Sequence, residues 1–70
     1  MIIKFINNVN KAEMFRLDGA MFHVPSVGVH IVNERVEWVV EGTLIDYDTH
    51  DVNVFIRKAA SYDVNYMKQH

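Results

Sequence analysis

Residues 36–57, VEWVVEGTLIDYDTHDVNVFIR, decide the fold. In the second part of this stretch, residues 51–57, valine or isoleucine stands at every even position and polar residues or Phe55 stand between them. Alternation with a period of two is typical of a strand that has one buried face. We therefore predict a strand here, with the aromatic ring of Phe55 exposed on its polar face.

The first part of the stretch, residues 36–47, contains a second apolar set in strand phase. Its members are Val36, Trp38, Val40 and Leu44. This phase assigns Trp38 to the core, and Gly42 interrupts the run as a candidate bulge. The short polar residues 48–50 separate the two parts, so the whole stretch predicts a hairpin.

Further strands are predicted upstream of this hairpin. Valine and isoleucine number seventeen against six for leucine and alanine, a bias that suits a pleated surface better than a helix. Residues 27–31 alternate, and residues 33–35 can turn this strand back into the hairpin to form a three-stranded meander. Residues 2–6 and 14–17 are two further short strands, joined by the polar loop 7–11.

These five strands predict an all-β domain over residues 1–58. A flat sheet of this size cannot bury a core by itself, so we expect a small five-stranded curled sheet or barrel. Residues 59–70 are helix-tolerant but have no convincing apolar period, and we expect a C-terminal tail or a short helix. The chain has no cysteine, which fits a reducing, cytoplasmic location.

Several segments together resemble a known group of proteins. They are Pro25-Ser26-Val27-Gly28, Ile31, Trp38-Val39-Val40, Leu44-Ile45-Asp46-Tyr47-Asp48 and Val52-Asn53-Val54-Phe55-Ile56. Residues 24–57 thereby resemble short phage and prophage proteins that fold as Src-homology-3-like barrels, with a departure at residues 29–30, where an acidic residue often follows the glycine. The resemblance implies a viral or mobile-element origin, a small binding module acting in the host cytoplasm and no catalytic residues.

The acidic residues 46–51 invite comparison with a metal site. The alternating carboxylates of Asp46 and Asp48, followed by His50 and Asp51, resemble the start of a calcium loop. However, Asp51 stands where such a loop needs glycine, and Arg57 stands where it needs glutamate. A solvated hairpin turn explains these residues better, because aspartate is a common turn residue.

Other chemical motifs are also missing from the sequence. The chain contains His23, His30, His50 and His70, with no pair at the i, i+4 spacing of a zinc site. His23 and His30 could meet across neighbouring strands, but a polar strand position explains them better. Neither serine has a nucleophile-elbow setting, and the glycines are too far apart for a phosphate loop. We predict no metal, no cofactor and no enzymatic activity.

Charge is distributed unevenly along the chain. Residues 34–51 carry six carboxylates against Arg35 alone, a balance of −5 in a chain with a net charge of −2. Residues 1–16 and 52–70 each carry +2. An acidic hairpin of this kind repels phosphate backbones and attracts basic protein grooves. An ordinary solvated strand face is the alternative explanation.

A partner-binding surface is predicted where this charge coincides with exposed aromatic residues, which often anchor protein interfaces. Its members are Glu37, Glu41, Asp46, Tyr47, Asp48, Asp51 and Phe55. We expect a non-catalytic phage-type accessory protein that binds, and inhibits or redirects, a host protein with a basic surface.

Alternative roles are a nucleic-acid-binding barrel, which the lack of a basic excess disfavours, and a virion structural component. A homodimer formed through an edge strand next to Phe55 is also compatible with the pattern. No membrane role is expected, because the longest apolar runs are far shorter than the roughly 20 residues of a membrane span.

Overall fold

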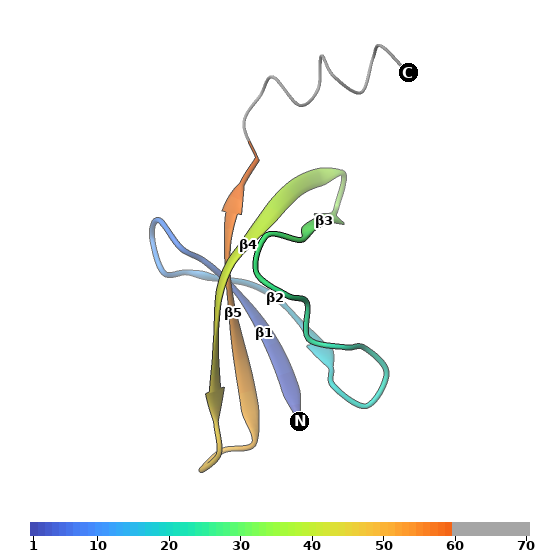
Figure 1. Cartoon of the computed structure of the whole chain (residues 1–70), viewed down its shortest axis with the longest axis vertical. Coiled ribbons are helices and arrows are strands. Elements are labelled where there is room, and N and C mark those ends of the chain that lie inside the picture. Colours follow the sequence, from blue (N-terminus) through green and yellow to red (C-terminus); the bar gives the residue numbers. More distant parts are fainter. Residues whose placement is uncertain (60–70) are drawn as a thin grey trace.

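A computed structural model describes residues 1–59, and all of their regular secondary structure is strand. The strands are β1 (Ile2–Asn7), β2 (Glu13–Asp18), β3 (His30–Asn33), β4 (Val36–Asp46) and β5 (Asp51–Lys58). They form a single curled sheet, which is about half of a barrel (Figure 1). The prediction of a small all-β fold is confirmed. The predicted tail or helix lies, apart from Ala59, outside the described residues.

The strand order in the sheet is β2-β1-β5-β4-β3. The predicted meander of β3, β4 and β5 is confirmed, because each of these strands pairs antiparallel with the next. β1 then pairs parallel with β5, and β2 pairs antiparallel with β1. As a result β1, β5 and β4 are interior strands, whereas β2 and β3 are the two edges and are not paired with each other. Within residues 1–59 no helix is long and apolar enough to span a membrane.

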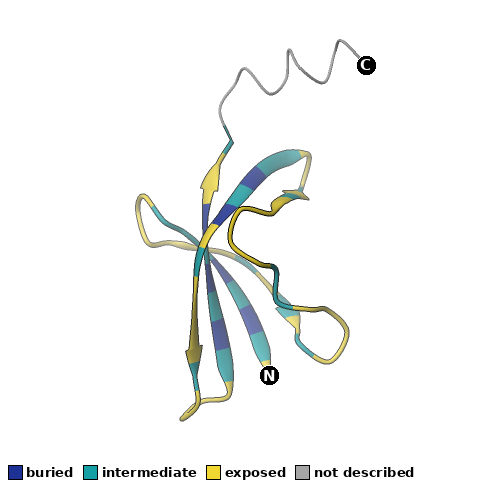
Figure 2. Cartoon of the chain, viewed as in Figure 1, coloured by how far each residue is buried: buried dark blue, intermediate teal, exposed yellow. Residues whose placement is uncertain are grey.

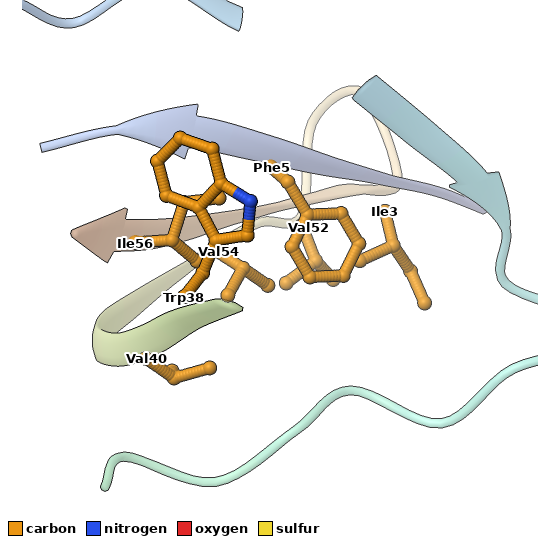
Figure 3. Packing of buried hydrophobic residues seen from close by; sticks show 7 residues of the cluster. All are labelled: Ile3, Phe5, Trp38, Val40, Val52, Val54 and Ile56. Atoms are coloured by element: carbon orange, nitrogen blue, oxygen red, sulfur yellow. The ribbon is translucent and has the colours of Figure 1, made fainter. Parts of the chain in front are cut away.

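The core lies on one face of the sheet. Its buried side chains are Ile3, Phe5, Trp38, Val40, Val52, Val54 and Ile56, and they come from the three interior strands (Figure 3). Buried and more exposed residues alternate along β1 and β5, as Figure 2 shows. The predicted inward positions of β5 and the predicted burial of Trp38 are thus confirmed. Phe15 extends the core onto β2 by stacking on Phe5, with ring centroids 4.4 Å apart.

A bulge in β4 is confirmed near Gly42, and it corrects the predicted orientation of Leu44. Val40 lies opposite Ile56 and Gly42 lies opposite Phe55, so Glu41 is the extra residue. One extra residue reverses which side chains face the core, because the strand period is two. Leu44 therefore lies opposite Asn53 on the other face and is 56% exposed.

β3 begins later than the alternation of residues 27–31 predicts. Residues 26–29 form a turn instead, in which the Val29 N–H donates to the Ser26 carbonyl at 3.2 Å. Gly28 has a φ of 93°, a conformation that glycine adopts without steric cost, and its N–H donates to the Val40 carbonyl at 2.8 Å. The chain therefore enters the sheet with Val27 and Val29 exposed.

The predicted turn between β3 and β4 is a two-residue turn of poorly suited residues. Asn33 pairs with Val36, and the residues between them, Glu34 and Arg35, have φ values of 52° and 66°. Two positive φ values are typical of a type I′ turn, which favours Asn-Gly. This left-handed backbone conformation is costly for every residue that has a Cβ, except asparagine and aspartate.

We predict that the double variant Glu34→Asn/Arg35→Gly raises the free energy of unfolding by about 1 kcal/mol, because it removes the backbone cost of the turn. Urea denaturation followed by circular dichroism measures this change. The variant Glu34→Gln/Arg35→Lys is the control, because it keeps the unfavourable backbone preference. An equal gain in both variants would contradict the explanation.

We also predict that Ile56→Ala lowers the free energy of unfolding by about 2–5 kcal/mol, because it leaves a cavity at the centre of the core. Ile56 is completely buried. The control is Val9→Ala, because Val9 is 67% exposed, and its expected effect is within about 0.5 kcal/mol. Similar losses in the two variants would mean that the core is not where the structure places it.

Candidate functional site

The seven residues of the predicted partner-binding surface all lie on the β4–β5 hairpin. Five of them lie on the sheet face opposite the core: Glu37, Glu41, Asp46, Asp51 and Phe55. The other two, Tyr47 and Asp48, belong to the turn that joins the strands. The structure thus places them on one hairpin but spreads them over its whole length.

Asp46, Tyr47 and Asp48 form the tip of the hairpin. The Asp46 carboxylate accepts hydrogen bonds from the backbone N–H groups of Asp48, at 2.9 Å, and Thr49, at 3.3 Å. Such bonds are the reason why aspartate suits turns. Tyr47 is 81% exposed, as predicted. Within residues 1–59 no group of three histidine, aspartate or glutamate side chains is placed to hold a metal ion.

Asp51 is bound to the N-terminal strand. Its carboxylate accepts a hydrogen bond from the Ile2 N–H at 3.3 Å and lies 3.4 Å from the Lys4 ammonium. Partial burial raises the pKa of Asp51, but the Ile2 N–H and the Lys4 ammonium outweigh this effect and hold the pKa below its usual value. The pairing also offsets repulsion from Asp46, which lies directly opposite in the ladder.

Glu41, the bulge residue, has two partners. Its carboxylate accepts a hydrogen bond from the Asn8 side-chain amide at 2.9 Å and one from the Arg57 guanidinium at 3.0 Å. The Asn8 bond and then the Arg57 bond hold the pKa of Glu41 below its usual value. This carboxylate therefore ties the β1–β2 turn and β5 to the bulge.

Glu37 is the partner of His30, one of the two histidines for which a polar strand position was the preferred explanation. Its carboxylate lies 2.6 Å from the His30 Nδ1 on the neighbouring strand β3. His23 lies in the segment between β2 and β3, so His23 and His30 are not on neighbouring strands. A polar strand position, the explanation that the sequence favoured, accounts for His30.

Phe55 is less exposed than the alternation of β5 predicts. It is half-buried, and the Lys11 ammonium lies 5.6 Å from the centroid of its ring. A cation over an aromatic face is favourable and covers part of the ring. β5 has interior neighbours on both sides, so the expected edge strand next to Phe55 is not present.

Three of the predicted carboxylates are therefore in contact with side chains of other segments of the fold. They are those of Glu37, Glu41 and Asp51. The negative charge that is left for an outside partner lies mainly at the tip, on Asp46 and Asp48. The predicted acidic surface is therefore confined mainly to the tip of the hairpin and does not extend along its whole length.

A second surface lies between the two edge strands, and the sequence interpretation missed it. A cavity of about 310 Å³ opens between β2, the loop of residues 19–29 and β3. We call it the β2–β3 seam. Its lining residues are Phe5, Phe15, Leu17, Phe22, His23, Pro25, Ile31, Val32 and Asn33. Most of the lining is apolar, and Phe22 and Val32 are 49% and 69% exposed.

Backbone groups that have no hydrogen-bond partner among the described residues 1–59 border the seam on both sides. The Gly19 N–H donates to the Met1 carbonyl, and the alternation of an antiparallel ladder then directs the N–H and C=O of Arg16 away from β1. Likewise, the Val40 N–H donates to the Val29 carbonyl. By the same alternation, the backbone N–H and C=O groups of His30 and Val32 point away from β4. The Arg16 side chain is held by Glu13 at 2.8 Å.

Only a weak signal for the seam was present in the sequence. Residues 21–22, Met-Phe, are an apolar pair in a segment without strand alternation, and such a pair in a loop needs a contact. Phe15, Leu17 and Ile31 follow the inward phase of their own strands. That these strands end the sheet depends on long-range pairing, which local patterns do not reveal.

Comparisons with protein-family models, curated protein sequences and solved structures find no match for this chain. The resemblance to phage and prophage proteins therefore rests on the quoted residues alone and stays a prediction.

We predict that Asn8→Ala and Arg57→Gln each raise the pKa of Glu41 toward the usual value of about 4.3, because each removes a donor to its carboxylate. The measurement is an NMR titration of the Glu41 side chain. Arg35→Gln is the control, since it removes a positive charge from the β3–β4 turn.

The same shift affects stability. The folded-state pKa of Glu41 lies below its unfolded-state pKa. The stabilisation that the ionised carboxylate provides is therefore complete at pH values above the unfolded-state pKa, and it is lost as the pH falls through the folded-state pKa. Glu41→Gln should therefore flatten the acid side of the stability profile. An unchanged profile would show that the Asn8 and Arg57 contacts do not form in solution.

Proposed function

We propose that this protein is a non-catalytic protein-binding domain that holds an extended segment of its partner in the β2–β3 seam. One observation carries the proposal: two strand edges that no other strand of residues 1–59 pairs with border an apolar cavity of about 310 Å³. Extended peptides bind such edges through backbone hydrogen bonds, while pockets take alternate side chains. The seam offers both kinds of contact at the same place.

The directions of the edge strands define how such a segment is held. β2 is antiparallel to β1, β1 is parallel to β5, and β3 is also parallel to β5 through β4, so β2 and β3 run in opposite directions. A strand between them is antiparallel to one edge and parallel to the other. Every second side chain of the segment then faces the cavity.

Charge defines one end of the partner segment. Ile2 pairs with Asp18 on one side and with Asp51 on the other, so β2 ends at the same end of the sheet as the hairpin tip. Asp18, Asp46 and Asp48 are acidic residues at this end. A basic residue at the corresponding end of the partner segment is favoured, because complementary charge speeds association and sets orientation.

The resemblance stated above supplies the biological setting of the proposal. It favours a phage or prophage protein that acts in the host cytoplasm and inhibits or redirects a host protein with a basic surface. The exposed tip at Asp46, Tyr47 and Asp48 supports a basic partner. The apolar seam supports a protein rather than a phosphate backbone as that partner.

We predict that a short peptide in which valine alternates with serine, ending in two lysines, binds about tenfold more tightly than a peptide of the same composition without alternation. NMR amide shifts measure the affinity and should change at Arg16, His30 and Val32. Phe22→Asp should weaken the binding, because it places a charge in the apolar lining. The control, Val9→Asp, should not.

Three results would contradict this proposal. Shift changes confined to residues 46–51 would move the binding surface to the predicted acidic tip. Equal binding of both peptides would show that the cavity does not select alternate apolar side chains. Binding of a single-stranded oligonucleotide in the seam, in place of the alternating peptide, would support the nucleic-acid alternative.

A further inference from the structure

A smaller cavity lies beside the larger one in the β2–β3 seam. It has a volume of about 160 Å³, and its lining residues are Met14, Phe15, Asn33, Glu34, Val36 and Trp38. Phe15 and Asn33 also line the larger cavity, so the two cavities are neighbours along the seam. The smaller cavity lies at the β3–β4 turn, which is at the end of β4 away from the hairpin tip (Figure 1).

The lining of the smaller cavity combines an apolar wall with one charged side chain. Met14, the extra residue of a bulge in β2, contributes to the apolar wall together with Val36 and Trp38 of β4. Among residues 1–59, Glu34 of the β3–β4 turn is the only charged residue in the lining. In the part of the chain that the structure describes, no lysine, arginine or histidine forms an ion pair with its carboxylate. The Glu34 carboxylate is therefore available to a cationic group of a partner.

The backbone of Glu34 gives independent support for a binding role. Its φ of 52° is costly for glutamate. Residues held in such conformations cluster at ligand-binding sites. A carboxylate that contacts a partner gives a reason for glutamate at this position, which the geometry of the turn alone does not.

A long basic side chain matches this lining. Lysine and arginine have apolar stems that lie along apolar surface while their charged heads stay in contact with water. A stem in the cavity contacts Met14 and Trp38, and its cationic head at the rim meets the Glu34 carboxylate. A cation close to a tryptophan ring is also favourable. An acidic side chain, in contrast, is repelled by Glu34.

The charges of the two edge strands indicate which of them pairs with a partner segment. β2 carries Glu13, Arg16 and Asp18, and charged side chains on an edge strand disfavour pairing with another chain. β3 carries no lysine, arginine, aspartate or glutamate. Antiparallel pairing is also slightly more stable than parallel pairing. The segment is therefore expected to run antiparallel to β3, from the β3–β4 turn toward the end of the sheet where the hairpin tip lies.

The positions of the two cavities fit an extended segment in this orientation. Ile31 and Asn33 face the core side of the sheet, because they lie opposite Trp38 and Val36. Side chains two residues apart in a strand point to the same face and are about 6.6 Å apart. A side chain beside Asn33 therefore enters the smaller cavity, and the side chain two residues later, beside Ile31, enters the larger one.

We propose that the smaller cavity binds a lysine or arginine side chain of the partner segment, two residues before the apolar side chain that enters the larger cavity. The basic head pairs with Glu34 and the stem packs on Trp38. This inference specifies the partner of the proposed function, and it rests on that function for the pairing with β3. The partner segment then has a basic residue at each end, the second one near Asp18 and the hairpin tip.

The test uses the full-length chain and matched peptides. The alternating valine–serine peptide carries in place of its first valine either lysine or norleucine, an unbranched side chain without the charge. Glu34→Gln should weaken binding of the lysine peptide about threefold and leave that of the norleucine peptide unchanged, because an exposed ion pair is of modest strength. Arginine and citrulline at the same position give the same comparison for the other basic residue.

The control variant is Asp48→Asn, which removes a carboxylate at the hairpin tip. It should change the affinities of the charged and the uncharged peptide by the same factor, because both carry the same terminal lysines. If Glu34→Gln also has equal effects within the lysine pair and within the arginine pair, the proposal is overturned.

Trp38 provides a second measurement, because it is the only tryptophan of the chain. Nuclear Overhauser contacts should connect the methylene groups of the peptide lysine with the Trp38 ring. A peptide with lysine in place of its last valine should show neither these contacts nor a dependence on Glu34. If both features appear with the last position and not with the first, the segment runs in the opposite direction and the proposed order of the two side chains is wrong.

Further outcomes separate this inference from the proposed function. If the peptides shift the amide signals of His30 and Val32 but the charge of Glu34 has no effect, the inference is wrong and the proposed function stands. If no peptide shifts these signals, N-acetyl-lysine methylamide is titrated alone. A shift of the Trp38 indole N–H signal that Glu34→Gln abolishes would then support the basic pocket without the proposed function, and the absence of this shift would overturn both.

Discussion

The parallel pairing of β1 with β5 is the contact on which the rest of the structure depends. Ile3 lies beside Val52 and Phe5 beside Val54, and these two strands supply five of the seven buried side chains. The pairing places β5 in the interior of the sheet and moves the edges outward to β2 and β3. Both the burial of the core and the position of the seam follow from it.

Local features of the fold could be predicted, because they depend on neighbouring residues. The alternation around Val54 identified the faces of β5, and Gly42 marked the bulge. The consequence of the bulge for Leu44 was missed, because an extra residue reverses the phase of every later position. The position of β1 was also missed, since the pattern of residues 2–6 is compatible with several neighbours.

The candidate site was only partly predictable for the same reason. The tip at Asp46 and Tyr47 is made of consecutive residues, and their exposure follows from turn chemistry. The partners of Asp51 and Glu41 include Lys4 and Asn8, which are far away in the sequence. A count of charges along residues 34–51 cannot include them. The seam could be predicted only if both edge strands were known, and no local sequence pattern shows which strands lie at the edges.

The β1–β5 pairing also sets the order in which the chain can fold. The β3–β4 and β4–β5 hairpins join strands that are adjacent in the sequence, and such contacts close quickly. Ile3 and Val52, in contrast, are separated by most of the domain, and closing that loop is slow. During synthesis β1 leaves the ribosome first but has no parallel partner until β5 follows. Until β5 emerges, the apolar side chains of Ile3 and Phe5 therefore lack the cover that Val52 and Val54 provide, and apolar surface exposed in this way makes a partly folded chain prone to aggregation.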